Sequence, residues 1–372
     1  MYREITKKIQ NILGQKKSPI VLLLGLRQTG KTTLAKNISK KQKIQLFNFD
    51  LQSNQQEFLN PDRHSLELFS QRYKGYIIVI DEFQKLPEAS NVIKHLYDNF
   101  GIKFILTGSS ELKIRKNAGD SLAGRITTFN LYPLSLKEIL VQDKIVPESG
   151  AAPYDKAQTI LKRILVHGSL PSLQNISNDN WENYLTEFTE TLLSKDVLEM
   201  SGIRKSTKIY TLAKLLAMQI GQLVNVNELA TLLELPRTTI YNYLDILEQM
   251  SLIKRSHPIS TNERRAIASK FKVYFTDLGI RNYLVGNFSS VGSRLDTGQL
   301  LENYSFISIK RSLDYAQKNY NLGFFRSESG SEIDIVLKTK EGEKLYEVKT
   351  NPKRAKKDTG IIYITMETAY EL

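Results

Sequence analysis

The octapeptide GLRQTGKT at residues 25–32 constrains this chain more than any other feature. It fits the pattern G-x-x-x-x-G-K-[ST], follows an apolar run and precedes the helical segment KTTLAKNI, which is the context that a phosphate-binding loop requires. Gly25 and Gly30 allow the backbone to curl so that its N–H groups face a phosphate chain. The N-terminus of the following helix adds partial positive charge. The sequence therefore predicts a nucleoside triphosphate site at this turn.

The side chains of this loop have separable predicted roles. Lys31 is expected to reach the β- and γ-phosphates, and the Thr32 hydroxyl is expected to bind Mg²⁺. The other loop residues predicted to contact the nucleotide are Gln28, Thr29 and Thr33. ATP and Mg²⁺ are accordingly the predicted cofactors.

A second apolar strand, in YIIVIDEFQKLPE, ends in the pair Asp81-Glu82, about fifty residues after the loop. At such a strand end an aspartate supports Mg²⁺. A glutamate directly after it can orient and deprotonate the attacking water. The pair therefore favours ATP hydrolysis over binding alone.

Three further residues could take part in this chemistry. Thr107 or Ser109, at the end of the strand FILTGSS, could sense the γ-phosphate, although a strand-end cap explains them nearly as well. Arg125, in LAGR, could be an arginine finger in the same chain or toward a neighbouring subunit of an oligomer. A surface salt bridge explains Arg125 equally well.

The chain reads as three segments. Residues 1–143 alternate short apolar strands with helical patterns, which predicts an α/β fold with a parallel sheet. After a linker at 146–155, residues 156–285 read as mostly helical, with a helix, a turn, a helix and a hairpin in the order of a winged helix-turn-helix. Residues 290–372 read as an α+β unit.

The winged-helix pattern predicts a DNA contact, with a protein-contact module as the alternative. Residues expected to reach bases or phosphates from the second helix are Arg237, Thr238, Tyr241 and Asn242. The predicted wing, 254–272, is rich in lysine and arginine, including Arg264 and Arg265, and basic wings contact phosphate backbones.

Composition points the same way. The formal net charge is +13 and the pI is near 9.5, which favours nucleic acid first and an anionic membrane second as the polyanionic partner. No cysteine is present, which suggests a reducing compartment, and we expect a cytoplasmic protein. No apolar run approaches the ~18 residues of a membrane span, and the N-terminus lacks the apolar stretch of a signal peptide.

The C-terminal stretch EIDIVLKTKEGEKLYEVKT predicts a hairpin that turns at Glu341-Gly342. That register pairs Val336 with Glu347 and Asp334 with Lys349, and places Asp334, Glu347 and Lys349 on one face. Two carboxylates can share Mg²⁺, a lysine can assist the attacking water, and Glu302 could add another acid. This is the layout of PD-(D/E)xK nucleases. Two other interpretations remain open. The three residues could be charges on a solvated hairpin face, or the domain could keep the nuclease fold and bind nucleic acid without cutting it.

The motifs GLRQTGKTTL, IDEFQKLPE, LTGSS, LAGR, LYPLSLKEIL and HGSLP together resemble a large family of prokaryotic AAA-type ATPases. The resemblance covers nearly the whole chain. It implies a C-terminal domain of unknown function with a restriction-endonuclease-like fold, whereas HGSLP, at 167–171, has no obvious chemical role. The leading hypothesis is a Mg²⁺-dependent ATPase that acts on or near DNA. The alternatives are an ATP-dependent switch that recruits a protein partner and an ATP-controlled endonuclease.

Overall fold

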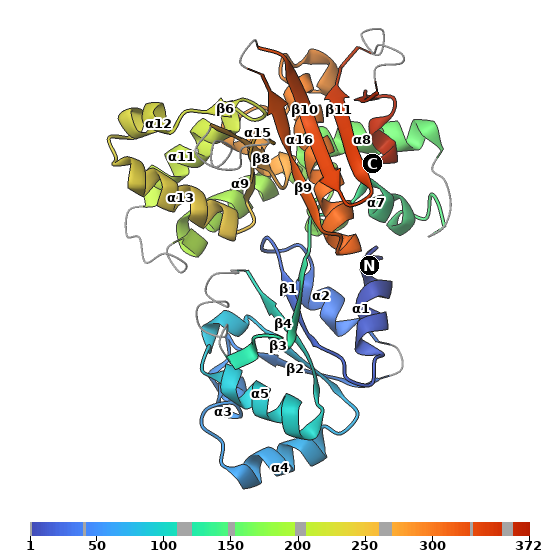
Figure 1. The fold of residues 1–372 in the computed structure, drawn as a ribbon, viewed down its shortest axis with the longest axis vertical. Coiled ribbons are helices and arrows are strands. Elements are labelled where there is room, and N and C mark those ends of the chain that lie inside the picture. Colours follow the sequence, from blue (N-terminus) through green and yellow to red (C-terminus); the bar gives the residue numbers. More distant parts are fainter. Residues whose placement is uncertain are drawn as a thin grey trace. The chain divides into compact units, whose positions relative to one another are not determined.

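The computed structural model describes residues 2–39, 42–109, 121–147, 153–197, 206–259, 270–327, 330–351 and 360–372 (Figure 1). The chain divides into two compact units, Met1–Tyr132 and Pro133–Leu372. Residues 133–143, which the sequence pattern places in the first domain, belong to the second unit. Leu134 there donates its backbone N–H to the Ser169 carbonyl at 2.9 Å, and helix α7 (Leu136–Gln142) packs against α8 (Tyr154–His167).

The first unit is built on a five-stranded parallel sheet in the order β2-β3-β4-β1-β5. Its strands are β1 (Ile20–Leu24), β2 (Ile44–Asn48), β3 (Ile77–Asp81), β4 (Lys103–Gly108) and β5 (Ile126–Asn130). Its helices are α1 (Thr6–Leu13), α2 (Lys31–Lys36), α3 (Gln52–Gln56), α4 (Arg63–Arg72) and α5 (Ala89–Phe100). The first four strands are the apolar runs of the sequence. The edge strand β5 is not predicted, because its sequence, ITTFN, is half polar.

The strand order determines where the site forms. Strand β4 lies between β1 and β3, and all three run in the same direction. Their carboxyl ends therefore meet at one edge of the sheet, where ligands of open parallel sheets bind. The GLRQTGKT loop follows β1, Asp81 ends β3, and Thr107 lies near the end of β4.

The first part of the second unit is mostly helical. After α7 and α8 its helices are α9 (Trp181–Thr191), a π-helical turn (Leu192–Asp196), α11 (Ser206–Met218), α12 (Val226–Leu233), α13 (Arg237–Gln249) and α15 (Leu278–Val285). Strands β6 (Leu223–Val224), β7 (Ile253–Ser256) and β8 (Phe271–Phe275) form a sheet in the order β6-β8-β7. The predicted core stripe of α13, made of Ile240, Leu244 and Leu247, is fully buried. The two-residue strand β6 gives no signal in the sequence.

The last part of the chain begins with the 20-residue helix α16 (Thr297–Ala316), which lies along one face of a four-stranded sheet (Figure 1). The strands are β9 (Tyr320–Arg326), β10 (Glu332–Thr339), β11 (Gly342–Val348) and β12 (Ile361–Ile364), in the order β12-β11-β10-β9. Neighbours β9, β10 and β11 are antiparallel, and β12 runs parallel to β11.

The hairpin between β10 and β11 corrects the predicted register. Thr339 pairs with Gly342 and Val336 pairs with Leu345, so the loop is Lys340-Glu341 and the register differs by two residues from the predicted one. The positive φ of 131° belongs to Gly342, the first residue of β11, rather than to a residue inside the turn. Because side chains alternate with a period of two, this slip keeps the predicted face.

The HGSLP segment connects the end of α8 to α15 through hydrogen bonds. Gly168, with φ +74°, ends α8 and lies against the carboxylate of Asp277. That carboxylate accepts the backbone N–H groups of Ser169 at 2.8 Å and Gly279 at 2.9 Å, and so caps α15. Asn282 donates its amide to the carbonyls of Leu165 and Val166. The segment therefore joins two helices that are distant in sequence.

Candidate active site

The phosphate-binding loop has the backbone that the sequence predicts. Gly25, Gln28 and Gly30 have φ values of 149°, 61° and 88°, so the chain turns tightly between β1 and α2. A Cβ on Gly25 would lie 2.2 Å from the Leu131 carbonyl oxygen, a distance that only glycine permits. The ammonium of Lys31 is buried in the loop, 2.9 Å from the carbonyl oxygens of Gly25 and Leu26.

The end of β3 meets the start of α2. The Thr32 hydroxyl lies 2.9 Å from Oδ1 and 2.8 Å from Oδ2 of Asp81, and the Thr107 hydroxyl from β4 donates to the same Oδ1. Asp81 is buried, as is Thr107. Hydroxyl and carboxylate oxygens are the hard ligands that Mg²⁺ prefers. The donor set therefore fits a Mg²⁺–nucleotide complex, with Thr32 and Asp81 as the residues that would hold the ion.

Glu82 follows Asp81 in a left-handed backbone conformation, with φ 54°, which is uncommon for a residue other than glycine. Burial raises the pKa of its carboxyl, and the Lys31 ammonium and the Gln84 amide act against that rise. A carboxylate with a raised pKa is a stronger base toward water. Its position beside Asp81 and Lys31 suits it to orient and deprotonate an attacking water.

Two residues that the sequence motifs do not indicate support this site. Gln84 donates its Nε2 to the Glu82 carboxylate and to the Ser109 hydroxyl, the latter at 3.3 Å, and so connects the ends of β3 and β4. In the sequence, the only feature that points to Gln84 is its position two residues after Glu82. Arg3, 2% exposed, donates to the carbonyls of Thr29 in the loop and Tyr132 after β5. No pattern near the N-terminus indicates that role.

Of the remaining predicted loop residues, Thr29 is buried and donates its hydroxyl to the Leu26 carbonyl at 2.8 Å, whereas Thr33 is exposed on α2. Ser109 lies at the end of β4 beside Gln84, in reach of the site through that amide. The predicted γ-phosphate sensors therefore have different positions: Thr107 contacts Asp81 directly, and Ser109 contacts the residue that holds Glu82.

Arg125 lies away from this site. Its carbonyl accepts the N–H of Ile20, the first residue of β1, whereas the phosphate-binding loop follows the last residue of that strand. At 3.3 Å a residue, the five-residue strand separates the two positions by roughly 15 Å. The guanidinium forms two 2.8 Å hydrogen bonds to Asp98 of α5. This contact is the salt bridge that the sequence offers as the alternative, and a finger role, in the same chain or toward a neighbouring subunit, stays a prediction.

Comparison with known proteins agrees with this geometry. Residues 17–140 match the family of AAA domains. The N-terminal unit contains an AAA-type P-loop ATPase domain. Beyond this AAA-type domain, residues 158–291 and 297–368 match two domains of unknown function, DUF8612 and DUF4143.

Two relatives, each named as an uncharacterized protein, match most of this chain. A protein of Methanocaldococcus jannaschii is 26% identical over 90% of this chain and 76% of its own length. A protein of Mycobacterium tuberculosis is 27% identical over 73% of this chain, which spans 57% of that relative. Among solved structures, a Walker-type ATPase of Pyrococcus abyssi has a TM-score of 0.51 at 17% identity and covers 76% of this chain and 95% of its own. That likeness supports the fold of the AAA-type domain.

The predicted DNA-contacting residues of α13 are exposed: Arg237, Thr238, Tyr241 and Asn242. Arg237, Thr238 and Tyr241 line a cavity of about 450 Å³ together with Lys270 and Phe271. Arg264 and Arg265 lie outside the described residues. Two other basic residues of the predicted wing are engaged within the protein: Lys272 is 2% exposed, and Arg255 forms ion pairs with Asp245 and Glu248 at 2.7 and 2.6 Å.

Each carboxylate of the predicted nuclease-like site has a partner within the protein. Asp334 Oδ2 accepts the Val348 N–H at 2.8 Å, and Glu347 Oε2 lies 2.6 Å from the Lys349 ammonium. Glu302 accepts from two side chains of β8. Within the described ranges, no group of three or more His, Cys, Asp or Glu side chains is arranged to hold a metal ion. Over the same ranges, no helix is both long and apolar enough to cross a membrane.

Proposed function

We propose that this chain is a Mg²⁺-dependent ATPase that acts on DNA through its winged-helix region. The observation that carries the ATPase part is the arrangement at the end of β3. Asp81 is held by the hydroxyls of Thr32 and Thr107, and Glu82 beside it is oriented by Gln84. Mg²⁺ would neutralise charge on the β- and γ-phosphates when bound there. Thr32 and Asp81 would hold the ion, Lys31 would bind the phosphates, and Glu82 would take the proton of the attacking water.

The DNA part is supported by the order of elements in residues 206–275. The order is helix α11, strand β6, helices α12 and α13, and strands β7 and β8, with the sheet order β6-β8-β7. This order is the one expected of a winged helix-turn-helix and so supports the proposal. The exposed polar residues at the start of α13 face a cavity that Lys270 also lines. A net charge of +13 favours a polyanion as the partner.

The direct test is the ATPase rate with and without duplex and single-stranded DNA, with a gel of the same DNA. DNA should raise the rate several-fold, and Lys31→Ala should abolish turnover. Arg237→Ala and Tyr241→Ala should reduce the stimulation while the basal rate stays unchanged. Lys214→Ala, which removes an exposed lysine from α11 of the same region, is the matched control and should retain full stimulation.

Replacing Arg264 and Arg265 with alanine separates binding to phosphates from binding to bases. The double variant should weaken binding to all sequences alike and reduce the log–log salt slope by about one unit for each phosphate that the protein no longer neutralises. If the double variant keeps the parent's DNA affinity and salt slope, and DNA does not change the ATPase rate, the results would instead support a switch that recruits a protein partner.

A further inference from the structure

A buried lysine lies between two acidic side chains of the C-terminal region. Lys272, on strand β8, is 2% exposed, and its ammonium lies 3.0 Å from Glu302 Oε1 and 2.7 Å from Glu332 Oε1. Tyr274, two residues later on the same strand, donates its hydroxyl to Glu302 Oε1 at 2.6 Å. A charge this deeply buried requires close opposite charge, and these two carboxylates supply it.

One acid of the predicted nuclease-like site, Glu302, contacts this ammonium directly, together with Glu332 of β10. Burial raises the pKa of Glu302 to about 7, the Lys272 ammonium acts against that rise, and the negative charge of Asp334 adds to it. Burial also raises the pKa of Glu347, and the charges of Asp334 and Glu332 add to that rise. Lys272 thus brings a positive charge from a different part of the chain to Glu302 and Glu332.

We propose that the Lys272 ammonium is the resident cation of these acidic side chains and that it keeps divalent metal ions out of the nuclease-like site. An ammonium and a divalent ion on the same Glu302 carboxylate would repel each other at short range, so the Lys272 ammonium disfavours metal binding there. This inference goes beyond the proposed ATPase function and does not depend on it.

The backbone of Lys272 is held by pairing with two neighbouring strands. Its backbone pairs with Ser256 of β7 on one side and Leu223 of β6 on the other. The segment after β7 continues onto strand β9, where Ile259 donates its N–H to the Phe324 carbonyl at 2.7 Å. The Phe324 ring lies 5.3 Å from the ammonium. Strands of the winged-helix region and of the C-terminal sheet therefore hold the lysine in place together.

The test measures Mn²⁺ binding to the full chain without nucleotide, from the decrease of the free-ion electron paramagnetic resonance signal. The parent and Glu302→Gln should bind the same number of Mn²⁺ ions, since Glu302 is already occupied by Lys272. Lys272→Met should bind one additional Mn²⁺, at least tenfold more tightly than any shared weak sites, and Glu302→Gln in that background should remove it. Lys272→Met/Glu332→Gln, which deletes one acid with the lysine, covers the case in which the single variant fails to fold.

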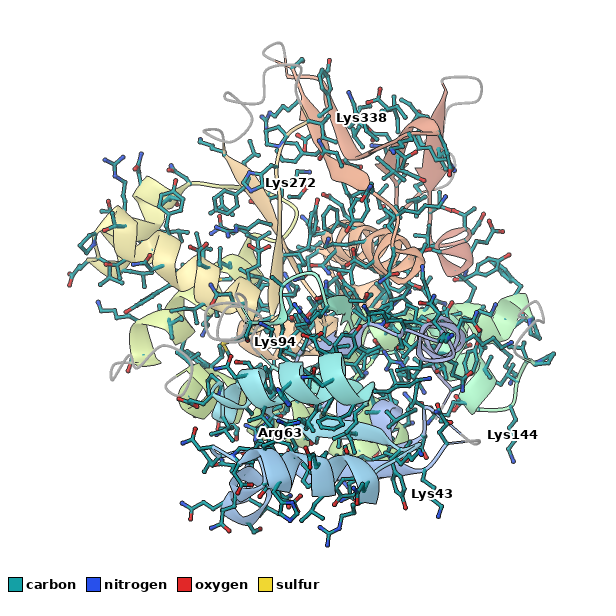
Figure 2. All side chains as sticks on the ribbon, turned by 60° about the horizontal axis from the view of Figure 1, so that its bottom comes forward. Lys43, Arg63, Lys94, Lys144, Lys272 and Lys338 are labelled. Carbon is teal, nitrogen blue, oxygen red and sulfur yellow. The ribbon has the colours of Figure 1, made fainter. Side chains whose placement is uncertain are left out.

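Lys338→Met is the matched control, because Lys338 pairs with Glu343 across the same β10–β11 hairpin but is 45% exposed (Figure 2). It should bind Mn²⁺ as the parent does. A parent chain that binds a Mn²⁺ ion absent from Glu302→Gln would overturn the proposal. A folded Lys272→Met/Glu332→Gln chain that binds no more Mn²⁺ than the parent would also overturn it.

Discussion

Gly168 leaves the space that the carboxylate of Asp277 fills. A Cβ on Gly168 would lie 2.0 Å from Asp277 Oδ1, and the φ of +74° disfavours any other residue. Gly168→Ala should therefore destabilise the second unit by about 3 kcal/mol or more, since it adds a steric clash in the core to a strained backbone. Denaturant unfolding of the full chain measures the decrease in stability.

Gly286→Ala is the control for that substitution. Gly286 also ends a helix with φ +70°, but a Cβ there would meet nothing within 4 Å. It should cost only the ~1–2 kcal/mol of a left-handed alanine. Equal destabilisation of the two variants would show that the packing of Gly168 against Asp277 is unimportant.

The buried Asp277 should give stability a measurable pH dependence. Burial raises the pKa of Asp277 from 3.8 to about 6, although backbone hydrogen bonds from Ser169, Ile280 and Gly279 oppose the rise. A raised folded-state pKa contributes stability that is fully present below about pH 4 and is lost as the pH rises through about 6. The unfolding free energy of the parent, measured relative to that of Asp277→Asn, should therefore fall by on the order of 2 kcal/mol between pH 4 and 7. Parallel stability curves for the two chains would contradict this assignment.

The Arg3 guanidinium should stabilise the phosphate-binding loop. Arg3→Ala leaves the buried carbonyls of Thr29 and Tyr132 without this donor, at a cost of ~1–3 kcal/mol in unfolding free energy. ATP affinity should also fall, and Arg3→Lys should recover part of both, because an ammonium can still donate to a carbonyl. Equilibrium binding of a fluorescent ATP analogue, alongside denaturant unfolding, measures the two effects.

Arg63→Ala is the control for the Arg3 variants, because it removes an arginine of the same unit whose side chain is 89% exposed and forms an ion pair with Glu67 on the surface of α4. It should change the unfolding free energy by less than about 0.5 kcal/mol and leave ATP affinity unchanged. If Arg3→Ala behaves like this control, the N-terminal segment plays no part in holding the loop.

The AAA-type domain can be predicted well from the sequence because its signals are local. A glycine-bounded loop between an apolar strand and a helix, and an acid pair at a strand end, each specify their own geometry within a few residues. By contrast, the end of the sheet at which a residue lies depends on contacts between distant parts of the chain. Arg125 resembles a finger within its own motif, but its contact with Asp98 at the opposite end of the strands depends on how the parallel strands assemble.

The C-terminal acids are the harder case. Alternation along the hairpin places Asp334 and Glu347 on one face despite a register error of two residues, since a slip of two preserves the face. Nothing in the hairpin indicates that Lys272, sixty-two positions before Asp334, reaches the neighbouring Glu302. The pattern around that lysine, KFKVYF, is that of an ordinary strand, and the sequence places it in a DNA-contacting wing.

The most direct measurement of the central claim compares ATP binding and single-turnover hydrolysis in the parent, Lys31→Ala and Glu82→Gln. Lys31→Ala should lose both, because the β- and γ-phosphates lose their counter-charge. Glu82→Gln should bind ATP with the parent's affinity and hydrolyse it ~10²–10⁴ times more slowly, because the amide cannot accept the proton of the attacking water. A Glu82→Gln chain that hydrolyses ATP at the parent rate would show that this carboxylate does not activate the water.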